Sequence, residues 1–222
     1  SKSQRQAIAP SFRSVLNPQL GLFLGSRLMI IMAIASFQTY GLFFLRDSVG
    51  LDNPAEALGR MILVIAGALA IAVYVAGWVS DRVGRKSVVM AGAIGAAIST
   101  LWMLTADDSV QLLVIASVIA ATVGVLLSAN WALANELADE SQAGLHIGIV
   151  NLATVCGAAG AKFLGPIIDA MNHIPGHPDD FGYQALITAD AAFFLVGALL
   201  LIPLKTTGRE NIVRDADQLH GQ

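Results

Sequence analysis

Three side chains that can hold an ion or hydrogen-bond a solute lie inside long apolar stretches of the sequence: Arg27, Gln38 and Asp190. Charged and amide side chains are costly within a membrane and mark solute or ion sites by default. Arg27 and Gln38 are separated by about three turns of an α-helix, so a single helix face carries both. We therefore expect these residues to line a polar cavity within the bilayer.

Arg27 and Asp190 also carry opposite charges. At 1.5 Å per residue, Arg27 lies roughly 14 Å from the inner edge of the bilayer and Asp190 roughly 10 Å from the outer edge. We expect them either to form an ion pair near the midplane or to line the cavity separately. Structural roles remain as alternatives, because Arg27 can extend its guanidinium group toward the interface and Asp190 can hydrogen-bond a neighbouring helix.

Further polar side chains lie on the fourth and fifth apolar stretches. Asn130 and Glu136 are near the inner end of the fourth stretch, and Asn151 is on the fifth. We expect Asn130 and Asn151 either to face the cavity or to bridge helices. Glu136 is expected to form a salt bridge with Arg82 or Arg85 rather than to contact the solute directly.

The composition is that of an integral membrane protein. Hydrophobic residues make up 55% of the sequence and charged residues 13%, and the mean hydropathy is +0.67. This leaves too few polar side chains to cover the surface of a soluble globule. The net charge of −3 and the lack of a long basic run argue against a nucleic-acid partner.

No cofactor and no enzymatic chemistry are predicted. Cys156 is the single cysteine, which leaves no internal disulfide and no cysteine metal site. His173 and His177 lie near two aspartates, but no third rigid ligand for a metal accompanies them. The sequence also lacks a nucleophile triad and a phosphate-binding glycine loop, which argues against a hydrolase or an ATPase.

Six apolar segments are each long enough for a membrane-spanning helix, which needs roughly 20 residues. The sequence thus predicts an all-α membrane protein with a six-helix transmembrane bundle over residues 18–204. Residues 1–17 form a polar N-terminal segment and residues 205–222 a tail. The predicted helices are Pro18–Leu45, Gly59–Ser80, Ser87–Leu104, Val110–Leu133, Leu145–Ala170 and Tyr183–Leu204.

Small residues recur at every fourth position on one face of the fifth predicted helix, at Ala153, Gly157, Ala161 and Gly165. Helices in lipid pack closely where small side chains let their backbones approach. This face is therefore expected to meet another helix.

The basic residues set the predicted orientation. With six spans, most of them fall on one side of the membrane, which the positive-inside rule assigns to the cytoplasm. Both chain ends are then cytoplasmic. The basic residues on this side are Lys2, Arg5, Arg13, Arg82, Arg85, Lys86, Lys205, Arg209 and Arg214.

A short loop between the second and third predicted helices, Gly77–Ser87, combines glycines with charges of both signs. Gly77 permits close contact at the helix end, and Asp81 is placed where it can cap the positive N-terminus of a neighbouring helix. Arg85 can bridge to an acidic partner. The alternative is that the basic residues here are ordinary positive-inside residues without a specific contact.

Six residues of this loop match a known pattern: Gly77, Asp81, Arg82, Gly84, Arg85 and Lys86. They resemble the signature loop of the major facilitator superfamily, G-x-x-x-D-R-x-G-R-K, which lies between the second and third of six helices. The resemblance extends over nearly the whole chain. It implies one six-helix half of a two-half transporter that holds its solute at the midplane between the halves. It also implies that the matching Asp and Arg hold the halves together on the cytoplasmic side in the outward-open state.

Other stretches are similar to C-terminal halves of the glycoside-pentoside-hexuronide group, in the sugar-cation symporter branch of the superfamily. The similarity implies a C-terminal half, for which residues 1–17 would be a trimmed central cytoplasmic loop. The stretches are Asn130-Trp131-Ala132-Leu133-Ala134 with Glu136, Asn151-Leu152-Ala153, and Gly165-Pro166.

The resemblance implies half of a secondary active transporter in the bacterial cytoplasmic membrane, which would move a small, polar, sugar-like solute by alternating access. Since the sequence shows no nucleotide site, the expected energy source is a gradient of H+ or Na+. The predicted partners are the lipid bilayer, the solute, and either a missing six-helix half or a second copy. The alternative is a non-transporting membrane subunit or assembly factor of a larger complex, since the cavity face of a single half needs a cover.

Overall fold

The computed structural model describes residues 18–48, 53–106, 108–137, 143–178 and 180–205. This part of the chain contains six spans long and apolar enough to cross a membrane, and no strand. The predicted all-α, six-helix architecture is confirmed. The N-terminal segment 1–17 and nearly all of the tail lie outside the described residues.

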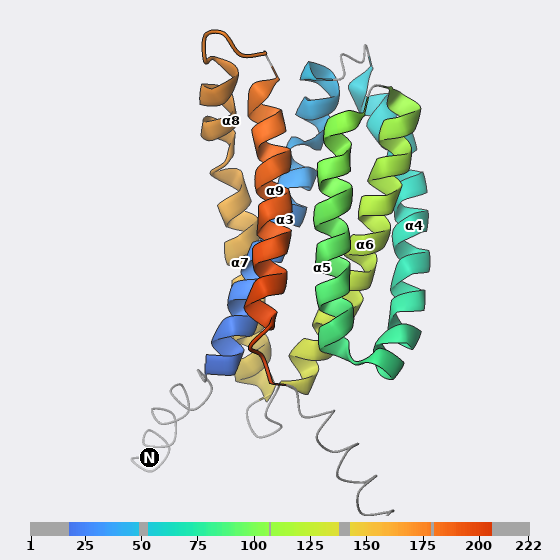
Figure 1. Ribbon diagram of the computed structural model, residues 1–222, viewed down its shortest axis with the longest axis vertical. Helices are drawn as coiled ribbons and strands as arrows, with labels where there is room; N and C mark the ends of the chain where they lie inside the picture. Colours follow the sequence, from blue (N-terminus) through green and yellow to red (C-terminus); the bar gives the residue numbers. More distant parts are fainter. Residues whose placement is uncertain (1–17, 49–52, 107, 138–142, 179, 206–222) are drawn as a thin grey trace, which may run out of the picture.

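Within the described residues, seven α-helices and one 3₁₀ turn make up the bundle (Figure 1). Most ends fall within a few residues of the predicted ones, and the second helix begins five residues earlier. The elements are α3 Pro18–Asp47, α4 Pro54–Val83, α5 Arg85–Trp102, η1 Met103–Thr105, α6 Ser109–Glu136, α7 Ala143–Lys162, α8 Gly165–Asn172 and α9 Phe181–Leu201.

The local sequence explains where several helices begin. The Asp108 carboxylate accepts hydrogen bonds from the backbone N–H groups of Val110 and Gln111, both at 2.8 Å, and so caps the first turn of α6. α4 and α5 are separated by Gly84 alone, at φ 96°. This left-handed conformation suits glycine and turns the chain within one residue.

The fifth predicted span is two helices, not one. α7 ends at Lys162 and α8 begins at Gly165. Pro166 has no N–H and cannot donate to the carbonyl of Lys162, so the helical ladder is interrupted. The Tyr40 hydroxyl lies 3.1 Å from that carbonyl and 3.2 Å from the carbonyl of Ala161, which partly replaces the missing bond. A continuous helix over Leu145–Ala170 was therefore a wrong prediction.

The helices pack in two groups that meet along α5 and α9 (Figure 1). α3 lies against α7 and α9, whereas α6 lies against α4 and α5. The small-residue face of α7 does meet α3, because a Cβ placed on Gly157 would lie 2.7 Å from the carbonyl oxygen of Leu28. On the other side of α3, the Ser26 hydroxyl donates to the carbonyl of Gly197 at 2.7 Å.

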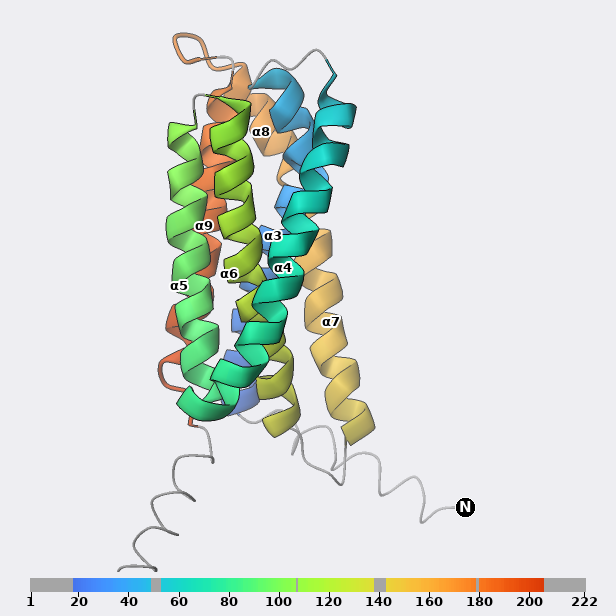
Figure 2. The ribbon, with the colours of Figure 1, turned by 90° about the vertical axis from the view of Figure 1, so that its right-hand side faces the viewer.

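Two of the six spans are largely uncovered. Over the most apolar stretch of each span, 11% of the residues are buried in α4 and 22% in the span formed by α7 and α8, whereas 44% are buried in each of the other four. Both helices lie at the edge of the bundle (Figure 2). Large apolar side chains on α4 such as Leu63, Ile71 and Tyr74 are exposed.

Candidate functional site

Arg27 on α3 is almost completely buried, with 1% of its surface exposed. Its Nε donates to Oγ1 of Thr154 on α7 at 2.9 Å, and its Nη1 donates to Oδ1 of Asn130 on α6. The guanidinium carbon lies 4.3 Å from the ring centroid of Trp131, which is a cation–π distance. We call Arg27, Asn130, Trp131 and Thr154 the arginine cluster. It joins three helices inside the bundle.

The arginine cluster has no negative charge of its own. Among the described residues no carboxylate pairs with Arg27, and the amide nitrogen Nδ2 of Asn130 has no hydrogen-bond partner. A buried charge that only neutral groups contact is costly, and so is a buried N–H without an acceptor. The cluster therefore offers a positive charge and a free donor, which suit an oxygen-rich solute.

The expected ion pair between Arg27 and Asp190 is absent from the described residues. Asp190 on α9 is also 1% exposed, but its Oδ2 is hydrogen-bonded to the hydroxyl of Ser36. Ser36 lies nine residues beyond Arg27 on the same helix, which is about 14 Å at 1.5 Å per residue. The prediction estimated the depth of Arg27 from one membrane face and the depth of Asp190 from the other. An error of a few residues in each helix boundary was enough to give the two groups similar depths that they do not have.

Gln38 and Asn151 form no hydrogen bond with the arginine cluster among the described residues, although Asn151 lies one turn before Thr154 on α7. Gln38 is exposed and lines a cavity of about 220 Å³ between α3, α4 and α6, whose other lining residues are apolar. Asn151 is exposed and hydrogen-bonds no described residue. Of the predicted cavity residues, the structure thus brings together only Arg27 and Asn130.

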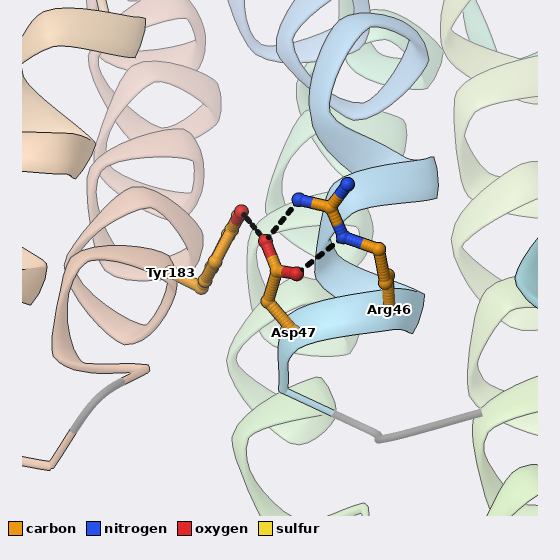
Figure 3. A network of polar contacts seen from close by, with 3 residues as sticks. All are labelled: Arg46, Asp47 and Tyr183. Carbon is orange, nitrogen blue, oxygen red and sulfur yellow. Dashed lines mark hydrogen bonds and ion pairs between the residues drawn. The ribbon is translucent and has the colours of Figure 1, made fainter. Parts of the chain in front are cut away.

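A polar network joins α3 to α9 at the end of the bundle opposite the Gly77–Ser87 loop (Figure 3). Asp47 accepts from Nε of Arg46 at 2.5 Å and from the Tyr183 hydroxyl at 2.8 Å. Arg46 is largely exposed. The sequence analysis did not single out this network, although adjacent opposite charges at a helix end are a visible signal for it.

Arg85 and Lys86 each contact the end of another helix. Nη1 of Arg85 lies 3.5 Å from Oε2 of Glu136 and donates to the carbonyl of Ala132 at 3.1 Å, both on α6. Nζ of Lys86 donates to the carbonyls of Ile202 and Leu204, at 2.8 and 2.7 Å, just beyond α9. Cations are favourable at helix C-termini, where carbonyl groups lack partners. The expected contact of Glu136 with Arg85 is present.

The rest of the loop makes fewer contacts within the chain. Asp81 is exposed and forms no hydrogen bond or ion pair with described residues. The guanidinium carbon of Arg82 lies 3.5 Å from the ring centroid of Trp78. The space beside Gly77 is open, since a Cβ there would meet nothing within 4 Å. The close helix contact expected at Gly77 is therefore not made by this part of the chain.

Comparison with known proteins identifies the family. The model of the Major Facilitator Superfamily matches residues 22–218. The chain belongs to the major facilitator superfamily. A search of curated proteins found no match. Membership and six apolar spans make the chain a multi-pass integral membrane protein of a family of transporters, which are typically not enzymes.

In this superfamily chain the loop and the arginine cluster are connected through one segment of α6. Asn130 and Trp131 contact Arg27, whereas Ala132 and Glu136 contact Arg85. The sequence analysis left two roles open for Asn130, a cavity position and a bridge between helices, and its hydrogen bond with Arg27 is such a bridge; it did not name a role for Trp131. Its position next to Asn130 was the available signal, but a tryptophan in an apolar helix is ordinarily a packing residue.

Proposed function

We propose that the chain forms one half of a secondary active transporter that moves a small polar solute by alternating access, driven by an ion gradient. The resemblance to sugar-cation symporters favours a sugar-like solute, a C-terminal half and a bacterial cytoplasmic membrane. Family membership supports transport in general. The arginine cluster is the observation that carries the proposal for this chain.

Burying an arginine without a counter-charge is costly, and its hydrogen bonds with Asn130 and Thr154 offset that cost within the fold. The remaining N–H groups of the guanidinium can hydrogen-bond the solute. The guanidinium group presents several N–H donors in a fixed plane, and Nδ2 of Asn130 adds another beside it. Hydroxyl and carboxylate oxygens are the acceptors that such a cluster fits. Trp131 is partly exposed and offers an apolar ring face next to the donors.

The uncovered faces of α4 and α7 support the presence of a second six-helix half. Tyr74 on α4 is 84% exposed, and α4 packs mainly against α6, which leaves most of the remaining surface of α4 uncovered. The second half belongs to the same polypeptide or to a second copy. Asp81 is free of partners among the described residues and is available to the second half as a latch on the cytoplasmic side.

The test is solute counterflow by the full-length protein in proteoliposomes, over a panel of neutral and acidic sugars. Arg27→Ala is expected to lower the initial rate by about tenfold to a hundredfold, since a hydrogen bond to a charged group contributes about 1.5–3 kcal/mol. Arg60→Ala is the matched control, because Arg60 is 79% exposed and, among the described residues, pairs only with Glu56 on the same helix. The control should transport at the wild-type rate.

Two results would contradict the proposal. Equal transport by the Arg27 and Arg60 variants would remove the arginine cluster from the solute site. Wild-type protein without counterflow of any solute would instead favour a non-transporting subunit, whose partner covers α4 and α7.

A further inference from the structure

The carboxyl group of Asp190 lies in a setting that favours its protonated form. Ser36 Oγ is within hydrogen-bond distance of both Oδ2 of Asp190 and the carbonyl of Ala33, the latter at 2.9 Å. A serine hydroxyl has one hydrogen and can donate to only one of them. Both contacts are satisfied together only when Asp190 carries a proton and donates it to Ser36, while Ser36 donates to Ala33.

The charges around Asp190 agree with this arrangement. Its other oxygen, Oδ1, is buried and has no partner among the described residues. A buried ionised carboxylate without a counter-ion is strongly unfavourable and takes up a proton instead. The titratable or charged groups on the helices packed against α9 are Arg27, Tyr40, Arg46 and Asp47 of α3, Asp169 of α8 with His173 just beyond that helix, and Arg85 and Lys86 at the distant end of α5. The cations among them, Arg27 included, have other partners.

A small cavity lies beside the carboxyl group of Asp190. It has a volume of about 20 Å³ and is lined by Ser36, Asp190, Tyr40 and Tyr183, together with apolar side chains. This space is sufficient for about one water molecule. Tyr183 at its rim donates to Asp47 in the exposed network at the far end (Figure 3). The cavity and Tyr183 thus lie between Asp190 and the network at that end.

We propose that Asp190 is a proton-binding site, loaded from the end of the bundle that carries Arg46, Asp47 and Tyr183. The proposal rests on the proposed transport function and assigns its coupling ion as H+. The proton passes from water in the cavity to an oxygen of the ionised Asp190 carboxylate, and no other bond forms or breaks. A metal cation fits less well, because hard cations take about six oxygen ligands and the described residues supply a carboxylate, one hydroxyl and one carbonyl here.

The site lies apart from the arginine cluster. Ser36 and Arg27 are separated by about 14 Å along α3, so a proton on Asp190 does not neutralise a charge in the solute site directly. Arg27 belongs to α3, and Asp190 is hydrogen-bonded to Ser36 of the same helix. Movement of α3 would therefore connect proton loading with solute binding.

Infrared spectroscopy of the purified full-length protein tests the protonation itself, with no need for a solute. The wild type should show a carbonyl stretching band of a protonated carboxyl group that persists at neutral pH and is lost in Asp190→Asn. Asp169→Asn is the control, because Asp169 is exposed, and it should retain the band. Ser36→Ala keeps the carboxyl group and should shift the band, since its hydrogen bond is removed. A band unchanged in Asp190→Asn or in Ser36→Ala would overturn the assignment.

Transport then tests the coupling. Uptake driven by a pH gradient should fall in Asp190→Asn to the rate without a gradient, whereas counterflow, which needs no gradient, should persist. Uptake by the wild type that follows a Na+ gradient and ignores pH would overturn the proton assignment and leave the transport function intact. Failure of wild-type counterflow would refute the transport function, while the infrared result would still decide the state of Asp190.

Discussion

The pairing of Arg27 with Asn130 makes a quantitative prediction about stability. Arg27→Met removes the guanidinium group and leaves the buried Asn130 amide without its present partner, which costs about 1–3 kcal/mol. Asn130→Leu leaves the buried charge with one hydrogen bond fewer, which costs about 1.5–3 kcal/mol. The double variant replaces both groups by apolar side chains of similar size. It should be close to the wild type in stability, because no buried polar group of the pair is then left unsatisfied.

The assay is thermal unfolding of the full-length protein in detergent, followed by tryptophan fluorescence. For a chain of this size about 1 kcal/mol corresponds to roughly 2–4 °C in Tm. Each single variant should therefore unfold several degrees below the wild type, and the double variant should recover most of the loss. All three should fail to transport. Stability restored without transport would separate the fold from the function of the cluster.

The control cycle uses Arg60 and Glu56, a pair one turn apart on α4 with both side chains mostly exposed. Exposed pairs of this kind contribute little to stability, so Arg60→Met and Glu56→Leu should be additive. If the Arg27→Met/Asn130→Leu variant loses as much stability as the two single variants combined, the proposed coupling between these side chains is refuted.

Three further changes test other contacts. Glu136→Gln weakens the contact with Arg85 and should change Tm by at most a few degrees. It should also increase the labelling of cysteines introduced at the cytoplasmic end of the proposed solute path. Unchanged labelling would argue against a latch. Gly157→Val should lower stability by about 1–3 kcal/mol through overpacking against the Leu28 carbonyl, seen as a lower Tm, and a wild-type Tm would mean that α3 and α7 are not in close contact. Tyr40→Phe should raise hydrogen exchange of the backbone around residues 161–166, and equal exchange would show that the hydroxyl does not support the helix break.

The sequence was sufficient to predict the number and position of the membrane spans. Each span is dominated by apolar residues over roughly the thickness of a bilayer, and this local property needs no knowledge of packing. The signature loop was also predictable, because all of its residues lie within a short stretch. The small residues on α7 correctly indicated a close helix contact, although the pattern did not say that α3 is the partner.

The predictions that failed required contacts between distant parts of the chain. The break in the fifth span was signalled by Gly165-Pro166, but the residue that supports it, Tyr40, lies more than a hundred positions earlier. The Arg27–Asp190 pair failed for a related reason. Hydropathy gives the approximate depth of a residue but neither the rotation of its helix nor the identity of the facing one, so Thr154 and Ser36 could not be recognised as the actual partners.

One segment of α6 connects the arginine cluster, which is the proposed solute site, with the Gly77–Ser87 loop. Asn130 contacts Arg27, and Ala132 and Glu136 contact Arg85, so both contact regions fall within two turns of one helix, about 9 Å along its axis. A helix segment this short moves as a unit. Rotation that adjusts Asn130 around a solute must therefore also displace Glu136 from Arg85. Solute binding and release of the proposed latch are in this way linked through a rigid element, without a longer chain of contacts.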